Sequence, residues 1–492
     1  MSSHNEQRPD YRLIIILLSG AFVAFLSNTF LNVALPSIKD EFGVTTSTVQ
    51  WVTTAYMLVS GIVVPTTAFL MQKFSARKLF LTSILLFLLG TAVAGFSPTF
   101  TVLILGRMLQ ASGSAILMPL LMNVMITSFA PEKRGTAMGV FSLVMFFAPA
   151  IGPTLSGFVV QTLSWHWLFY MMIPILLIVL AVGYFQLPEV GNKYNAKLDI
   201  PSVILSTIGF GGILYGFSAA GNSGWASFDV MLTLLVGIIA VYIYVMRQTK
   251  MESPMLDFKV YTFPMYRLSA IIIGVNNMAL FSGMILMPIF LQEIQDVSPL
   301  ETGLLLLPGA LIMGLLSPLS GKLFDIFGPR RLAVTGLAMA AVTTFFFSRL
   351  EIDTGFGYLL TVYAIRAVGL TLVNTPVMTN GMNDLPARLT PHGSSLNSML
   401  QQVSGAVGTA LLITIMQNWT NFRLSGIAEP TSAQMNQAML DGINLSFFIA
   451  SVLLFISMVL SFMLKRVTAK QTIQPGLTRA RVIEPDTLNK KK

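Results

Sequence analysis

The chain has 492 residues, of which 54% are hydrophobic and only 10% are charged. Apolar runs of about 18 residues or more recur along it, and runs of this kind cannot be buried inside water-soluble domains. The composition therefore excludes a soluble globular protein and indicates a membrane protein that crosses the bilayer many times. The net charge of +9 needs no nucleic-acid partner if it reflects membrane orientation.

A helix of about 20 residues rises about 30 Å and crosses the hydrocarbon core of a bilayer. Divided on this basis, the sequence predicts fourteen spanning helices. They cover residues 12–33, 50–71, 79–97, 100–125, 138–161, 166–187, 201–218, 227–246, 268–291, 301–324, 332–349, 356–380, 393–416 and 442–464.

Positively charged residues gather on one side of this arrangement. With both termini cytoplasmic, the terminal tails and even-numbered loops hold all but a few of the 30 Lys and Arg residues, as the positive-inside rule requires. The exceptions are Lys39, Arg349 and Arg423 on outer loops and Arg107 and Arg366 inside helices. The basic tail is expected either to rest on anionic membrane lipids or to be solvated and disordered.

The first predicted helix ends in a polar stretch. Asn28 and Asn32 are about one turn apart, so their amides lie on one face. Polar groups in a membrane turn toward a water-filled cavity or toward partners on other helices, and both readings stay open here. In the second helix, Trp51 is expected to anchor at the membrane interface. Tyr56, about one turn deeper, either faces substrate or anchors as well.

The fourth predicted helix carries a charge into the membrane. Arg107, Gln110 and Ser114 share one face at spacings of three and four residues. A buried Arg costs at least about 2.5–3.5 kcal/mol on insertion scales, so a functional role is expected. The alternative is a structural Arg that is satisfied by carbonyls and amides.

The fifth predicted helix contains Pro149, Gly152, Pro153 and Gly157. The prolines remove backbone donors and bend the helix, while the glycines permit close packing on a neighbour. We expect a hinge-like helix whose shape governs which side of the protein opens. For His166, which follows near the outer surface, a solvated interfacial position is favoured over a role as a proton relay.

The predicted helices at 201–218 and 227–246 follow a polar linker and lack strong polar stripes. They have no counterpart elsewhere in the chain. We interpret them as an inserted hairpin that lies outside the central pathway.

The turn at residues 321–331 joins two apolar helices. Gly321 allows two backbones to approach closely, and Asp325 offers a carboxylate to nearby helix ends or Arg side chains. Gly328, followed by a proline, forces the turn just before Arg330. These residues are predicted to control conformation.

The second half of the sequence repeats the first. At a nearly constant spacing, residues 68–78 correspond to 321–331, Arg107 to Arg366, and 135–137 to 393–395. This repetition predicts two six-helix bundles related by an axis along the membrane normal, with a binding site near the bilayer midplane between them. The predicted fold is all-α and polytopic, with an N-terminal bundle at 1–190, a linker with two extra helices at 191–260, a C-terminal bundle at 261–465 and a basic cytoplasmic tail at 466–492.

Polar side chains and deformable apolar ones within the predicted spans are candidates for contact with substrate. They are Asn28, Asn32, Tyr56, Gln110, Asn276, Asn277, Phe281, Met284, Asn374, Asn397 and Gln401. Residues 417–441 are expected to form the longest outer loop.

None of the 21 acidic residues falls in the middle of a predicted span. A carboxylate inside the membrane is the usual means of coupling proton entry to substrate release, because its charge changes with access. If transport is driven by protons, the sequence therefore predicts a coupling carboxylate at a helix end. Glu293 and either Asp40 or Glu41 are the candidates, acting with Arg107 and Arg366.

Several kinds of chemistry have no support in the sequence. It contains no phosphate-binding loop of the type Gly-x-x-x-x-Gly-Lys-[Ser/Thr], no cysteine, and only three histidines, His4, His166 and His392. We expect no enzyme activity, no cofactor, no metal site and no direct use of a nucleotide.

Four runs of residues resemble known signatures. Residues 321–331 resemble the loop signature of the major facilitator superfamily, Gly-x-Leu-x-Asp-x-x-Gly-x-Arg-[Arg/Lys]. Residues 29–36, 107–115 and 148–157 are similar to signatures of its fourteen-helix drug:proton antiporter branch. The resemblance implies that Arg107 is linked to proton coupling and that the proline-glycine run marks an exporter. Ser27 stands where that branch usually carries a membrane aspartate.

The resemblance implies a secondary active multidrug exporter of a bacterial inner membrane. It would move hydrophobic or amphiphilic small molecules outward by alternating access, in exchange for protons and among membrane lipids. Two alternatives stay open: an exporter or flippase of an endogenous lipid or metabolite, and a non-transporting membrane sensor built on the same fold.

Overall fold

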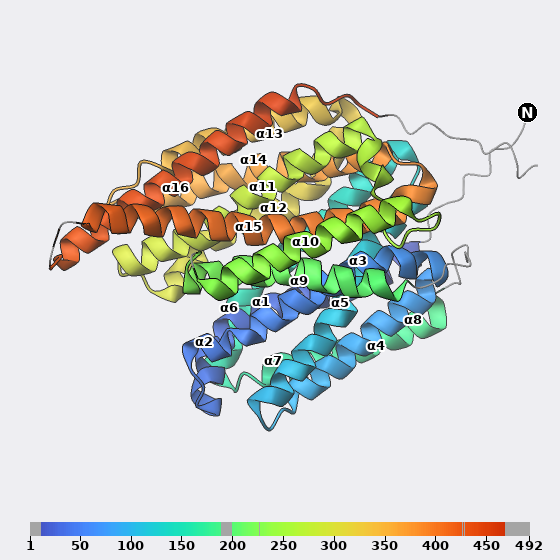
Figure 1. Cartoon of the computed structure of the whole chain (residues 1–492), viewed down its shortest axis with the longest axis horizontal. Helices are drawn as coiled ribbons and strands as arrows, with labels where there is room; N and C mark the ends of the chain where they lie inside the picture. The colour runs from blue at the N-terminus through green and yellow to red at the C-terminus, as the bar shows by residue number, and fades with distance from the viewer. Residues whose placement is uncertain (1–10, 188–198, 226, 426, 428, 468–492) are drawn as a thin grey trace, which may run out of the picture.

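The apolar runs of the sequence form long helices that lie side by side along one axis of the molecule (Figure 1). The computed structural model describes residues 11–187, 199–225, 227–425, 427 and 429–467, and within these residues there is no β-strand. Fourteen helices in this part of the chain are long and apolar enough to cross a membrane, as the sequence predicts.

The spanning helices have the following bounds: α1 Tyr11–Phe42, α3 Trp51–Lys73, α4 Ala76–Gly95, α5 Phe100–Ser128, α6 Arg134–Thr162, α8 Met172–Gln186, α9 Ile200–Ser223, α10 Phe228–Lys250, α11 Pro264–Ile289, α12 Pro299–Phe327, α13 Pro329–Phe347, α14 Phe356–Asn383, α15 Thr390–Leu424 and α16 Ser432–Ser461. The short helices α2 (Thr46–Val49) and α7 (Trp167–Tyr170) lie in connections. We call the end of the bundle that carries Lys73, Arg330 and Arg466 the basic end.

The prediction of a long outer loop at 417–441 is wrong. Helix α15 continues to Leu424 and α16 already begins at Ser432, so both flank the connection with helix where the loop was expected. The polar residues of this stretch pair with one another beyond the apolar span: Arg423 forms an ion pair with Asp441 at 2.5 Å, and Gln437 donates to Asp441 at 3.1 Å.

Helices α1–α8 and α11–α16 form two groups, which lie on opposite sides of the view in Figure 1. The two groups meet along α6 and α12. At the basic end, a Cβ atom added to Gly321 would lie 2.0 Å from the carbonyl oxygen of Gly135, so only glycine permits this approach of the two backbones. Farther along, Gly139 faces Ser317 and Gly314 faces Phe147. The second seam brings α3 against α15.

The inserted hairpin α9–α10 lies across the seam between the two groups (Figure 1). On one side, Leu214 of α9 packs on Gly61 of α3, and Tyr215 stacks on Trp51 with ring centroids 6.0 Å apart. On the other side, Trp225 donates a hydrogen bond to Thr414 of α15. The hairpin therefore contacts both halves of the protein.

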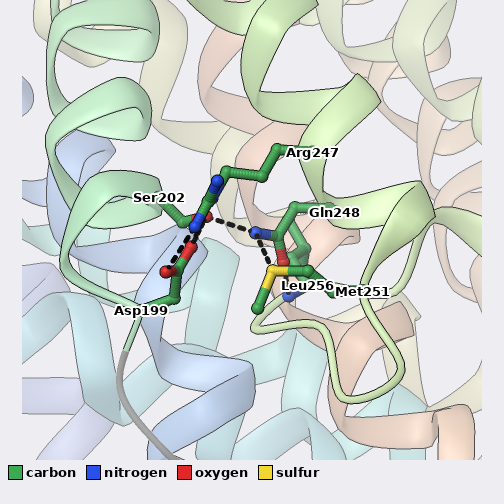
Figure 2. A network of polar contacts seen from close by, with 6 residues as sticks. All are labelled: Asp199, Ser202, Arg247, Gln248, Met251 and Leu256. Carbon is green, nitrogen blue, oxygen red and sulfur yellow. Dashed lines mark hydrogen bonds and ion pairs between the residues drawn. The ribbon is translucent and has the colours of Figure 1, made fainter.

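A polar network holds the base of this hairpin together (Figure 2). The Arg247 guanidinium binds both carboxylate oxygens of Asp199, at 2.7 and 2.9 Å, and lowers the pKa of that carboxyl to about 2. Gln248 is buried and donates to Ser202 at 2.6 Å, while its side-chain oxygen accepts from the backbone N–H of Leu256 at 3.1 Å. The network ties α9, α10 and the following connection into one unit.

The division of the chain into bundles at 1–190, 191–260 and 261–465 agrees with these contacts but stays a prediction. The predicted linker residues 191–198 and the basic tail from residue 468 onward lie outside the described residues.

Candidate functional site

The Arg107 side chain is buried in the N-terminal group of helices. Its exposed fraction is 0%, and its guanidinium carbon lies 4.2 Å from the centroid of the Tyr56 ring. The guanidinium donates to the side-chain oxygen of Gln110 at 2.7 Å, and Gln110 in turn donates to Thr91 at 2.7 Å. Its Nη2 atom has no hydrogen-bond partner among the described residues. The sequence brings Arg107 and Gln110 together because they are one turn apart on α5.

Tyr56 joins this cluster from α3. Its hydroxyl donates to Ser114 at 2.6 Å, and its side chain is 6% exposed. A tyrosine ring beneath a guanidinium stabilises the cation through the electron-rich face of the ring. Tyr56, Arg107 and Gln110, which the sequence assigns to substrate contact and to coupling, therefore form one group.

Arg366 occupies the equivalent place in the C-terminal group, with different partners. It is 2% exposed, its Nε donates to Thr344 at 3.0 Å, and its Nη2 donates to the carbonyl oxygen of Ala279 and to Ser282. A Cβ atom added to Gly283 would lie 2.3 Å from Nη1, so this glycine makes room for the guanidinium. Within the described part of the chain, neither buried arginine is paired with a carboxylate.

The partners of the two arginines include residues that motif reading alone does not single out. Thr91 and Thr344 stand at equivalent positions of the two halves, and each contacts the arginine cluster of its half. Thr91 and Thr344 could have been found from the sequence by comparing every polar residue of one half with the residue at the equivalent position of the other half. Ser282 and Gly283 have no comparable signal, because their role depends on how α11 is rotated against α14.

The predicted amides of the C-terminal group are buried and only partly paired. Asn276 donates to the carbonyl oxygen of Leu370 at 3.5 Å, whereas its own oxygen, the nitrogen of Asn277 and both polar atoms of Asn374 have no partner among the described residues. On the N-terminal side the oxygen of Asn28 is likewise buried without a partner. Unpaired buried polar atoms cost free energy, and these amides lie where the sequence predicts contact with substrate, which stays a prediction.

Four further predicted substrate residues lie around α11 and α15. Asn397 and Gln401 approach the sulfur of Met378 at 3.2 and 3.9 Å, and Asn397 also lies 3.7 Å from the sulfur of Met122 in the other half. Phe281 packs on Gly405 of α15. Met284 is 45% exposed. The side chain of Asn32 lies outside the part of the structure that is described.

The candidate coupling carboxylates lie at helix ends, as the sequence predicts. Glu41 accepts a hydrogen bond from the indole N–H of Trp165 at 2.6 Å, and its other oxygen lies 3.7 Å from His166 Nε2. His166 stacks on Trp165 with ring centroids 3.7 Å apart, and its side chain is 19% exposed in the connection between α6 and α7, so it is partly solvated. Asp40 and Glu293 are exposed and form no ion pair with another described residue.

Asp325 connects the two halves at the basic end. Its carboxylate accepts from the backbone N–H groups of Gly135 and Thr136, at 3.1 and 3.0 Å, and from the Thr136 hydroxyl at 2.8 Å. It therefore caps the first turn of α6, where the helix dipole favours a negative charge. Gly328 has a positive φ of 77°, and the Arg330 guanidinium lies 5.6 Å from the Phe462 ring centroid.

An equivalent contact joins the other seam at the same end. Thr67 and Ser395 share a hydrogen bond at 2.8 Å, and the Gln72 amide lies 2.5 Å from His392 Nε2. The other ring nitrogen of His392 accepts the backbone N–H of Asp257 at 3.0 Å. Gln72 stands in the weaker copy of the turn motif, in the place that Asp325 takes in the second copy. The role of His392 has no signal in the sequence.

The two glycines in the proline-glycine run of α6 differ in how closely a neighbouring helix approaches them. A Cβ atom added to Gly152 would lie 2.0 Å from the Thr29 hydroxyl oxygen, so this glycine permits close contact with α1. Gly157 has no neighbour within 4 Å of such an atom, so the expectation that it packs closely is wrong. Pro149 lies within α6, and the side chain of Pro153 lies outside what the structure describes.

Comparison with known proteins agrees with this architecture. The sequence model described as Major Facilitator Superfamily matches residues 17–409. The chain is 46% identical to the MFS-type transporter YhcA of Bacillus subtilis, and the match covers 85% of this chain and 79% of YhcA. It is 40% identical to the lincomycin resistance protein LmrB of Listeria monocytogenes, and that match covers 92% of this chain and 96% of LmrB.

Among solved structures, the human organic anion transporter MFSD10 (TETRAN) has a similar fold, with a TM-score of 0.65 over 92% of this chain and 99% of that one, at 14% sequence identity. The match of the family model, the fourteen apolar helices and the curated relatives lead to one conclusion. The chain belongs to the major facilitator superfamily, and it is a multi-pass membrane transporter rather than an enzyme, with relatives that are named for drug resistance.

Proposed function

We propose that this transporter exports hydrophobic or amphiphilic compounds, antibiotics among them, by alternating access and in exchange for protons. The similarity to a lincomycin resistance protein over nearly the full length of both chains supports outward transport of a drug-sized molecule. The orientation that the positive-inside rule favours places the basic end in the cytoplasm of a bacterial cell, together with both termini.

The observation that carries this proposal is that hydrogen bonds join the two halves at the basic end along both seams. Asp325 caps α6 on one seam, and Thr67 and Gln72 meet α15 on the other. Ser142 also bonds Thr375 across the halves at 2.9 Å. These bonds lie nearer the basic end than the opposite end. They favour a state that is closed to the cytoplasm, and a rocking motion that opens this side has to break them.

The coupling part of the proposal depends on where a carboxylate can accept a proton. Within the described residues no carboxylate lies in the middle of a spanning helix, so a proton has to be accepted nearer a helix end. Of the three candidates, Glu41 is the best placed, because Trp165 donates a hydrogen bond to its carboxylate and His166 Nε2 lies 3.7 Å from its other oxygen. Without an internal carboxylate, the interior has little to favour cationic over neutral substrates.

Efflux from cells tests the proposal. In an efflux-deficient bacterium, expression of this protein is expected to lower the accumulation of lincomycin and of neutral amphiphiles, and an uncoupler is expected to abolish the difference. Efflux that persists with the uncoupler would contradict proton coupling and favour the flippase alternative. If reconstituted protein binds these compounds but moves none of a panel of neutral, cationic and anionic compounds, the export proposal is wrong.

Three neutralising substitutions locate the coupling group. Glu41→Gln is expected to reduce gradient-driven efflux, and Asp40→Asn tests the other candidate at the same helix end. Glu293→Gln tests the C-terminal candidate. Efflux driven by the proton gradient is measured in proteoliposomes for each variant, and full activity in all three would remove the helix-end carboxylates from the mechanism.

A further inference from the structure

A groove opens on the side of the C-terminal helix group, between α11 and α15. Its volume is about 360 Å³. On α11 its lining residues recur every three or four positions, as Arg267, Ala270, Gly274 and Met278, so one face of the helix forms the wall. Ala279 and Ser282, which contact Arg366, lie further along the same helix than the lining residues, so the groove occupies the part of α11 nearer the basic end.

The groove continues toward the middle of the membrane as an apolar track. Leu400 and Ser404 of α15 form its second wall, and a narrow void of about 10 Å³ follows beyond Met278, beside Gly408. Ile271, on the rim, is 49% exposed. Both helices span the membrane, so lipid chains are the neighbours of an opening on this side.

The mouth of the groove at the basic end is polar and positively charged. Arg267 is exposed there and forms no ion pair with another described residue. Tyr261, from the segment Phe258–Thr262 that precedes α11, also lines the mouth. A tyrosine hydroxyl is protonated at neutral pH and can donate a hydrogen bond. A guanidinium and a hydroxyl at the end of an apolar track suit an anionic headgroup with an attached chain.

We propose that this groove is a binding site for one anionic phospholipid of the leaflet at the basic end, with its phosphate on Arg267 and Tyr261 and one acyl chain along Gly274 and Met278. A lipid in this position bridges α11 and α15. Because α15 carries Ser395 and His392, which contact the N-terminal half, the bound lipid stabilises the helix that closes this end. The inference does not depend on the direction of transport.

Native mass spectrometry of the full-length protein in detergent tests this site with added phosphatidylglycerol. The wild type is expected to retain one molecule of phosphatidylglycerol in preference to phosphatidylcholine. Arg267→Gln is expected to weaken retention about tenfold, as the loss of a charge-assisted hydrogen bond implies. Lys250→Gln is the matched control, because Lys250 is an exposed cation at the end of α10 that does not line the groove.

A second variant tests the chain track separately from the charge. Gly274→Leu fills the groove and is expected to remove retention while Arg267 stays in place. A melting temperature within a few degrees of the wild type, measured without lipid, shows that this variant folds. Equal losses in Arg267→Gln and Lys250→Gln, or full retention in both groove variants, would overturn the proposal. Displacement of the lipid by lincomycin would also overturn it, because the groove would then be a port for substrate.

Discussion

Arg107 and Arg366 show how a buried charge is kept in a membrane protein without a carboxylate. Insertion of an arginine into the middle of a membrane costs at least about 2.5–3.5 kcal/mol. A desolvated guanidinium over an aromatic ring recovers about 2 kcal/mol, and each hydrogen bond from a charged group about 1.5–3 kcal/mol. Tyr56 and Gln110 supply these terms for Arg107, while Thr344 and the Ala279 carbonyl supply them for Arg366.

A substitution that keeps the charge separates these contributions. Arg107→Lys retains the cation but loses the planar contact with Tyr56 and the geometry of the bond to Gln110. We expect uptake or efflux rates in proteoliposomes to fall about thirtyfold, since the lost interactions amount to about 2 kcal/mol. Arg331→Lys, at an exposed position of the basic end, is the control. Wild-type rates in Arg107→Lys would show that only the charge at this position is needed.

Glycine residues stand where pairs of helices in this protein approach each other most closely. Gly321 of α12 and Gly135 of α6 meet backbone to backbone, and Asp325 lies one turn further along α12 and caps the start of α6. The two effects depend on each other, because the carboxylate reaches the N–H groups of α6 only while the backbones are close. The basic end of this seam is therefore sensitive to a single methyl group.

Gly321→Ala tests this sensitivity. The added methyl group would lie 2.0 Å from the Gly135 carbonyl oxygen, so α6 and α12 have to separate, at a cost of about 1–3 kcal/mol by the measure of overpacked cores. We expect a lower melting temperature in detergent and reduced transport. Gly303→Ala, on the same helix, is the control because nothing lies within 4 Å of the added atom. Equal melting temperatures for the two variants would show that the backbone contact contributes nothing.

The arrangement of the whole chain is two helix groups with a hairpin across the seam between them. The bonds between the groups gather at the basic end, and the hairpin contacts α3 on one side and α15 on the other. The polar network of Asp199, Arg247 and Gln248 joins α9 and α10 at its base (Figure 2). A movement of the two groups therefore has to be accommodated at the hairpin's contacts.

The absence of cysteine from the sequence allows a direct test of that movement. Thr67 and Ser395 face each other across the seam at 2.8 Å, so Thr67→Cys with Ser395→Cys places two thiols within reach of a disulfide. Oxidation is expected to lock the basic end and abolish transport, and reduction is expected to restore it. Arg423→Cys with Asp441→Cys, within the C-terminal group, is the control pair. Undiminished transport by the oxidised seam pair would exclude opening at this end.

Much of this protein follows from properties that are local along the chain. Hydropathy predicts fourteen spans, because the length of an apolar run has to match the thickness of the bilayer. The repeated motifs pair residues 68–78 with 321–331, and both copies do lie at contacts between the halves. The buried positions of Arg107 and Arg366 also follow, since a charge within an apolar span has to face other helices.

The partners of these residues do not follow from the sequence. Whether Arg107 meets a tyrosine or a carboxylate, whether His392 reaches Gln72, and whether the inserted hairpin lies beside one half or across both depend on the rotation and depth of each helix. Many small packing contacts between distant segments set that rotation, and no short stretch of sequence contains them. The long loop expected at 417–441 is wrong for a different reason, because polar residues do not exclude helix: Thr431 and Gln434 form a capping box that starts α16, and Arg423 pairs with Asp441 across α15 and α16.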